Sequence, residues 1–202
     1  MKISYAKFYL SIIFFLAFVF SSQINAEIPA HVIKNINERC VVCHGEQGES
    51  SSPLFPKLAG SNYQYFAKQL NDFINGVRKT RTMTVQLRDI DPEDFEYYGI
   101  YYEQLKSTAE ANLGSIEKGK ELYENGRPEK GIIACKSCHG EKGYGSSTLP
   151  RLAGQIPEYT KRQLEKFSQR QRTNDNAVMQ DIANNLSEED ILEVAKYLAV
   201  IN

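Results

Sequence analysis

The chain contains one five-residue motif twice, and this repetition constrains its fold more than any other feature. In each copy two cysteines, separated by two residues, are followed at once by histidine: CVVCH begins at Cys40 and CKSCH at Cys135. An internal repeat of this kind predicts two homologous domains. Further matching positions are Pro56, Leu58, Ala59, Gly60 and Met83 in the first half and Pro150, Leu152, Ala153, Gly154 and Met179 in the second.

The repeat sets the expected domain limits. The boundary lies near residues 106 to 115, so we predict a first domain at residues 27–110 and a second at residues 111–202. Each domain is near the lower size limit for a self-sufficient apolar core. Something besides apolar burial is therefore expected to stabilise each half.

The N-terminus has the layout of a secretory signal peptide. Lys2 and Lys7 precede an apolar run from Phe8 to Phe20, and a polar stretch then ends at Ala26. A membrane anchor is the alternative, but about 13 apolar residues are fewer than the roughly 20 needed to span a bilayer. We predict cleavage after residue 26 and export to the periplasm.

The charge balance excludes one class of function. Removing residues 1–26 leaves 22 basic and 25 acidic side chains. A slightly acidic chain of this kind is not a strongly basic nucleic-acid binder, so no nucleic-acid partner is expected.

The end of each half carries signals for a helix. Ser187 with Asp190 resembles a capping box, and apolar residues then recur at helical spacing. Asp91, Pro92 and Asp94 form the matching signal in the first half. The predicted apolar faces contain Ile191, Val194, Ala195 and Leu198 in the second half and Phe95, Tyr98, Gly99 and Tyr102 in the first.

Shorter helical patterns precede the two motifs, at residues 32–39 and 116–123. No segment shows sustained alternation of polar and apolar residues, which is the pattern of a half-buried strand. The fold class predicted is therefore all-α.

The cysteine pairs indicate covalent haem. In an exported chain four cysteines normally predict disulfides, but a bridge within Cys40 and Cys43, or within Cys135 and Cys138, would close only a small loop. It would also leave His44 and His139 unexplained. Cys-x-x-Cys-His is the attachment motif of c-type haem, in which two thiols bind one porphyrin and the histidine binds its iron.

Two other chemistries use paired cysteines. Zinc ribbons place their pairs 15 to 20 residues apart, whereas these pairs lie about 92 residues apart. A thioredoxin-like dithiol needs a βαβ context, which the sequence lacks. We therefore predict two covalently bound haem c groups.

Methionine supplies the expected sixth ligand of each iron. Met83 follows His44 by 39 residues, and Met179 follows His139 by 40 residues. Methionine opposite histidine is typical of cytochromes c. The alternative is that both are adaptable core residues, but their matching positions in the repeat favour ligation.

Proline follows each motif at a similar distance, Pro56 in the first half and Pro150 in the second. In cytochromes c a proline carbonyl at this spacing accepts the N–H of the haem-binding imidazole. The prolines could also simply shape the following turn. The remaining histidine, His31, has no counterpart in the repeat, and we expect a surface or core role for it.

These residues resemble a known family, the dihaem cytochromes c4. The resemblance covers nearly all of residues 27–202 and is strongest in the second half, where LPRLAGQIPEYTKRQLEKF is followed by RTND ahead of Met179. It implies two tandem class I cytochrome c domains, each wrapped around one covalent haem. It also implies a periplasmic one-electron carrier in a respiratory chain rather than an enzyme.

The resemblance further implies redox partners: a cytochrome bc-type complex as donor, a haem-copper terminal oxidase as acceptor, and peripheral association with a membrane. The first half departs from the family pattern in its tyrosine-rich last helix, which contains Tyr97, Tyr98, Tyr101 and Tyr102. These tyrosines could cover a haem edge, meet the other domain or form an ordinary core face.

Two other functions stay open at this point. A dihaem enzyme, such as a peroxidase or a thiosulfate-oxidising cytochrome, would need an iron that is open or carries an unusual ligand. Methionine at both repeat positions argues against it. The chain could also be an electron-entry subunit of a larger redox complex.

Overall fold

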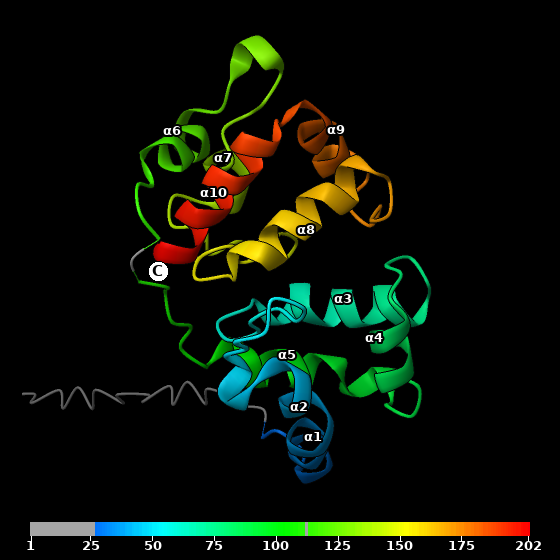
Figure 1. The fold of residues 1–202 in the computed structure, drawn as a ribbon. Helices are drawn as coiled ribbons and strands as arrows, with labels where there is room; N and C mark the ends of the chain where they lie inside the picture. The colour runs from blue at the N-terminus through cyan, green and yellow to red at the C-terminus, as the bar shows by residue number, and fades with distance from the viewer. Residues whose placement is uncertain (1–26, 112) are drawn as a thin grey trace, which may run out of the picture.

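The computed structural model describes residues 27–111 and 113–202, so the predicted signal peptide lies outside the described residues. The described chain forms two helical lobes (Figure 1). The first contains α1 (Ala30–Asn35), a π-helical turn (Ile36–Cys40), α2 (Val41–His44), a 3-10 turn (Glu46–Gly48), α3 (Tyr63–Ile74), α4 (Arg81–Gln86), a second 3-10 turn (Pro92–Asp94) and α5 (Phe95–Glu103).

The second lobe repeats this order with small differences. It contains α6 (Glu117–Asn125), a 3-10 turn (Pro128–Lys130), α7 (Lys136–His139), α8 (Pro157–Ser168), α9 (Val178–Asn185) and α10 (Glu188–Val200). In the part of the chain that the structure describes, the one β-type pairing is an isolated bridge between Arg127 and Ile132. The prediction of an all-α fold is confirmed.

Each lobe has its own apolar core. The first core joins α1, α3 and α5 through the buried side chains of Val32, Ile36, Phe66, Ala67, Leu70, Phe73, Leu87, Ile90, Phe95, Tyr98 and Tyr102. The second joins α6, α8 and α10 through Leu122, Tyr123, Ile132, Leu164, Ile191, Val194, Tyr197 and Leu198. Two cores agree with the two-domain prediction, whereas the boundary between residues 110 and 111 stays a prediction.

The last helix of each lobe presents the face that the sequence predicts. Phe95, Tyr98, Gly99 and Tyr102 are the buried residues of α5, so Tyr98 and Tyr102 belong to the core. Tyr97 and Tyr101 are half-buried against the same core. The tyrosine-rich helix therefore has the core face that was one of its three interpretations, whereas cover of a haem edge stays a prediction.

Helix ends follow their capping signals. The Ser187 hydroxyl accepts from the backbone N–H of Asp190, and the Asp190 carboxylate accepts from the backbone N–H of Ser187, each over 3.1 Å. The predicted capping box is thus confirmed. In the first lobe the Asp91 side chain accepts from the backbone N–H of Glu93 over 3.0 Å, and Pro92 opens the 3-10 turn that leads into α5.

Helices cross closely at two glycines. A Cβ atom at Gly99 of α5 would clash with the backbone of Tyr63 at the start of α3. In the second lobe Ala195 occupies the matching position and is fully buried. There the closest approach involves Gly119 of α6, where a Cβ atom would clash with the backbone of Glu193 in α10.

The two lobes differ most just before the repeated motif. In the first lobe the N-terminal helix runs through the π-helical turn directly into α2. In the second lobe α6 ends at Asn125, and a loop closed by the pairing of Arg127 with Ile132 separates it from α7. In both lobes the first cysteine of the motif packs against the core.

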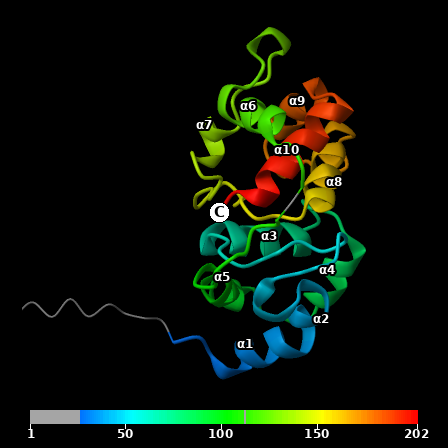
Figure 2. The ribbon, with the colours of Figure 1, turned by 60° about the vertical axis from the view of Figure 1, so that its left-hand side comes forward.

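The lobes meet along α3 and α8, which face each other across a seam in Figures 1 and 2. These helices are equivalent in the repeat. None of the helices within residues 27–111 and 113–202 combines the length and the apolar character that a membrane crossing requires.

Candidate haem sites

Each motif forms a short helical turn that carries its histidine inward. His44 ends α2 and is 6% exposed, and His139 ends α7 and is 5% exposed. The next residue is glycine in both cases, with φ of 76° at Gly45 and 84° at Gly140. This left-handed conformation, which glycine adopts without strain, ends the helix and turns the chain away.

The predicted prolines lie at the two histidines. Nδ1 of His44 lies 2.9 Å from the carbonyl oxygen of Pro56, and Nδ1 of His139 lies 3.2 Å from that of Pro150. A carbonyl oxygen can only accept, so each Nδ1 carries the hydrogen and donates it. Nε2 is then the nitrogen available to a metal, in a ring whose orientation is fixed.

Burial sets the protonation state of these rings. It lowers the pKa of His44 and of His139, and the hydrogen bonds to Pro56 and Pro150 offset only part of this effect. Both imidazoles are consequently neutral at neutral pH, which is the form that binds a metal.

The four cysteines form no disulfide, so all are available for another use. Burial raises the pKa of Cys40 to about 11 and that of Cys135 to about 11. Both are neutral thiols at pH 7. Each also packs against the core of its own lobe.

Each of the two methionines lies in a short helix between the two longest helices of its lobe. Met83 lies in α4 and Met179 in α9, and each is half-buried against the same core as Cys40 or Cys135, respectively. The Asp175 carboxylate accepts the backbone N–H of Met179 over 2.6 Å and fixes the start of α9. Ligation of iron by these sulfurs stays a prediction.

The residues of each lobe fit a covalent haem. Each lobe holds a buried neutral imidazole with a free Nε2 and two cysteines outside any disulfide, and the first cysteine and the methionine pack against the apolar core. This matches the donor set of a c-type haem. The buried hydroxyl of Tyr102 in the first core also lacks a hydrogen-bond partner among the described residues. His44 with Met83 and His139 with Met179 would hold the irons, and the four cysteines would hold the porphyrins.

The zinc hypothesis has no support from the geometry. Over the described ranges, no three side chains among His, Cys, Asp and Glu gather closely enough to hold a metal ion. His31 is also accounted for, because its Nε2 lies 2.7 Å from the carboxylate of Asp94 at the surface. Of the two roles expected for His31, surface or core, the structure shows the surface role.

Comparison with known proteins identifies the family. The chain is 38% identical to cytochrome c4 of Thiocapsa roseopersicina over 80% of its own length and 86% of that protein. It is 36% identical to cytochrome c4 of Pseudomonas aeruginosa over 79% and 82% of the two lengths. The chain belongs to the cytochrome c4 family. Residues 116–201 also match the family model "Cytochrome c".

The fold agrees with the family. The crystal structure of reduced recombinant cytochrome c4 from Pseudomonas stutzeri superposes with a TM-score of 0.80 at 33% identity and covers 87% of this chain and 99% of that one. Like other members of the cytochrome c4 family, the protein is therefore a class I cytochrome c with two covalent haem c groups. It is an electron-transfer protein, not an enzyme.

Sequence analysis missed a cluster at the seam between the lobes. Tyr65, Gln69 and Arg78 contact Tyr159, Gln163 and Arg172 there. The signal was present, because the two triplets occupy equivalent places in the repeat. The sequence does not reveal that repeat-equivalent faces turn toward each other.

Proposed function

We propose that this protein carries single electrons in the periplasm through two irons, one ligated by His44 and Met83 and the other by His139 and Met179. Cys40 and Cys43 would bind one porphyrin, and Cys135 and Cys138 the other. When bound, haem supplies the ferric–ferrous couple, while the chain sets its ligands, burial and access. An iron with both axial positions filled offers no place for a substrate, which suits a carrier.

One observation carries this proposal above the others. Both motif histidines are buried and donate Nδ1–H to a proline carbonyl, and each lobe holds a methionine at the repeat-equivalent place beside the same core as the first cysteine. The duplication of the whole arrangement supports the same ligation in both lobes.

The direction of electron flow belongs to the proposal as well. We infer a cytochrome bc-type complex as donor and a haem-copper terminal oxidase as acceptor, with peripheral association with the membrane that holds them. The proposal also includes cleavage after Ala26 and two domains, at residues 27–110 and 111–202. N-terminal sequencing of protein from the periplasm tests the cleavage site, and reduction by each purified complex tests the partners.

A second candidate function follows from the relatives. The chain is 33% identical to a thiosulfate dehydrogenase electron acceptor of Stutzerimonas stutzeri over 79% of its own length and 77% of that protein. This protein could accept electrons from such an enzyme. Thiosulfate alone should then leave the ferric protein oxidised, and thiosulfate with a thiosulfate dehydrogenase should reduce it. Reduction by thiosulfate alone would instead indicate an enzyme.

The far-red absorption band of sulfur-ligated ferric haem tests the axial ligands. Scaled to covalent haem, the band should have the intensity of two methionine-ligated irons per chain. Met83→Ala and Met179→Ala should each remove half of it, whereas Val85→Ala, at an exposed position on the same helix as Met83, should leave it intact. Full intensity in Met83→Ala would refute ligation in the first lobe.

A further inference from the structure

A side chain of the second lobe is hydrogen-bonded to the backbone of the first lobe beside His44. Gln155 lies just before α8, and its side-chain amide makes two bonds to Lys57, a buried residue of the first lobe. Its Oε1 accepts the backbone N–H of Lys57 over 3.0 Å, and its Nε2 donates to the carbonyl oxygen of Lys57 over 3.0 Å. The backbone of a loop in one lobe is therefore paired with a side chain of the other.

The orientation of the Gln155 amide is fixed by its partners. Its Oε1 also accepts the backbone N–H of Ile156 over 3.0 Å. Both partners of Oε1 are N–H donors and the partner of Nε2 is a carbonyl oxygen, so only one orientation of the amide satisfies all three bonds. Ile156 directly precedes the first residue of α8, and the start of this helix thus holds the side chain toward the first lobe.

The N–H group that Gln155 accepts belongs to the peptide unit between Pro56 and Lys57. The carbonyl of the same unit is that of Pro56, which accepts the Nδ1–H of His44 over 2.9 Å. In a trans peptide unit the N–H and the C=O point in opposite directions. Gln155, this peptide unit and His44 therefore form a continuous chain of hydrogen bonds from the second lobe to the imidazole of the first.

Such a chain changes the strength of its members. Hydrogen bonds in series polarise one another and strengthen by about 10 to 30% per bond. A peptide unit whose N–H donates has a carbonyl that accepts more strongly, so the Pro56 carbonyl attracts the Nδ1–H of His44 more strongly. An imidazole held in this way donates more electron density to a metal at Nε2.

The second lobe has no equivalent chain of hydrogen bonds. The position of Gln155 is taken in the first lobe by Ser61, and the backbone N–H groups of the two residues close equivalent turns, each over 3.2 Å. Among residues 27–111 and 113–202, the Ser61 side chain forms no hydrogen bond, and the backbone N–H of Arg151, which matches Lys57, has no acceptor. The effect is therefore expected at one histidine and not at the other.

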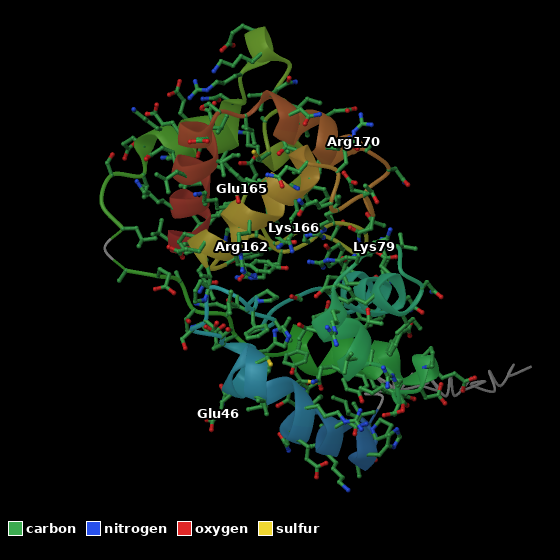
Figure 3. The ribbon with its side chains drawn as sticks, turned by 45° about the vertical axis from the view of Figure 1, so that its right-hand side comes forward. Glu46, Lys79, Arg162, Glu165, Lys166 and Arg170 are labelled. Carbon is green, nitrogen blue, oxygen red and sulfur yellow. The ribbon has the colours of Figure 1, made fainter. Side chains whose placement is uncertain are left out.

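Two further contacts hold the same loop of the first lobe. Arg162 of α8 donates to the carbonyl oxygen of Pro53, and Figure 3 shows this arginine on the side of the second lobe that faces the first. The Nζ of Lys57 donates to the carbonyl oxygen of Thr108, in the segment between α5 and α6, over 2.9 Å. Residues 53–57 are thus held by the second lobe and by the segment that joins the lobes.

We propose that Gln155 is a positioning residue for the haem of the other lobe, and that it lowers the reduction potential of this first haem by strengthening the hydrogen bond between His44 and Pro56. Electron density given to the iron stabilises its ferric state. Gln155 carries no charge, so the effect does not come from a charge near the haem. The proposal rests on ligation by His44 as proposed above and not on the direction of electron flow.

The test uses the mature dihaem protein and the variant Gln155→Ala. Spectroelectrochemical titration gives both midpoint potentials, and the haem methyl resonances assign each to a lobe. The equilibrium constant for reduction of the first haem should rise about threefold, which is about 28 mV for one electron, and that of the second should stay unchanged.

A second readout follows the hydrogen bond itself. In the reduced protein the Nδ1–H resonance of His44 should move upfield and exchange faster with solvent in Gln155→Ala, while that of His139 should stay in place. A side chain that only stabilises the seam would not weaken this one hydrogen bond selectively.

The matched control is Ser61→Ala at the repeat-equivalent position, which should leave both potentials and both Nδ1–H resonances unchanged. A first-haem potential and a His44 resonance in Gln155→Ala equal to those of this control would overturn the proposal. Equal shifts of both haems in Gln155→Ala would also overturn it, because they would indicate a general opening of the seam.

A second variant covers the case in which Gln155→Ala does not fold. Gln155→Leu fills a similar volume and offers no acceptor to Lys57, so it should produce the same two shifts, and unchanged values would overturn the proposal. The far-red band of methionine-ligated iron separates this inference from the proposed function. A missing band in the wild type would count against the axial ligands, whereas a persistent band with an unmoved first potential would count against the role of Gln155 alone.

Discussion

The Nδ1–H group of His44 donates to the carbonyl oxygen of Pro56 over 2.9 Å, and His139 and Pro150 repeat this relationship over 3.2 Å. The acceptor is a backbone atom, so its position depends on the loop between the motif and α3. Gly48 fixes part of that loop, because its carbonyl oxygen accepts from the backbone N–H of Leu58 over 2.8 Å. The loop thereby controls how strongly the imidazole donates to a metal.

Replacing Pro56 with alanine should raise the reduction potential of the first haem and leave the second unchanged. Alanine keeps the carbonyl but frees φ, so the hydrogen bond to His44 weakens and the imidazole donates less electron density to ferric iron. The freer unfolded chain should also cost about 0.4 to 1 kcal/mol of stability. Spectroelectrochemical titration measures the first effect and thermal unfolding the second.

The repeat supplies the control for this substitution. Pro150→Ala should raise the reduction potential of the second haem and leave that of the first unchanged. Equal shifts of both haems in either variant would show that the effect passes through the seam and not through the local hydrogen bond.

Adding a methyl group at Gly119 should destabilise the second lobe by about 1 to 3 kcal/mol. The new Cβ atom would clash with the backbone of Glu193, so α6 and α10 would have to separate. Lys120→Ala, at the next and exposed position of α6, should change the free energy of unfolding by no more than about 0.5 kcal/mol. Thermal unfolding followed by circular dichroism compares them. A Gly119→Ala variant as stable as Lys120→Ala would contradict the close crossing.

Much of this protein could be predicted from its sequence because the repeat records each feature twice. The motif with its histidine, the proline, the capping box at Ser187 and the buried face of α5 depend on local spacing. Such features involve residues close together in the chain, so the sequence alone is enough to predict them. The family assignment used the same residues and the comparisons confirmed it.

The features that were missed depend on long-range packing. Nothing in the sequence gives Gly119 a role, since the role comes from the close crossing of α6 and α10. The loop that pairs Arg127 with Ile132 breaks the repeat and has no counterpart from which to infer it. The contacts of Arg78 and Arg172 arise from the docking of two lobes, which no spacing within either half specifies.

The stability of α10 should depend on pH through Asp190. Burial by itself raises the pKa of this carboxyl, but hydrogen bonds from Ser187 and the ion pair with Arg127 at 3.1 Å outweigh it and hold the pKa below its ordinary value. A depressed folded-state pKa stabilises the protein above the unfolded-state pKa of about 3.9. That stabilisation is lost as the pH falls through the folded-state pKa.

Asp190→Asn should therefore destabilise the protein at pH 7 by about 1 kcal/mol or more, and the difference from wild type should shrink below about pH 4. Glu188→Gln, at an exposed position in the first turn of the same helix, should change stability by no more than about 0.5 kcal/mol. Denaturant unfolding at several pH values gives both numbers. A constant difference between pH 7 and pH 3 would rule out the ionised Asp190 as the cause.

The chain without haem should be largely unfolded. Each core belongs to a small lobe. Without haem, no metal would be bound by the buried histidines and half-buried methionines, which are His44, His139, Met83 and Met179. In holoprotein the covalent porphyrin adds a large apolar surface to each core, and burial of such surface is worth about 25 cal/mol per Å². Chain produced in the cytoplasm without haem-attachment machinery should give a poorly dispersed NMR spectrum and little helical circular dichroism. Matured protein of the same sequence should give dispersed resonances, and a dispersed spectrum from the haem-free chain would show that the two apolar cores suffice for folding.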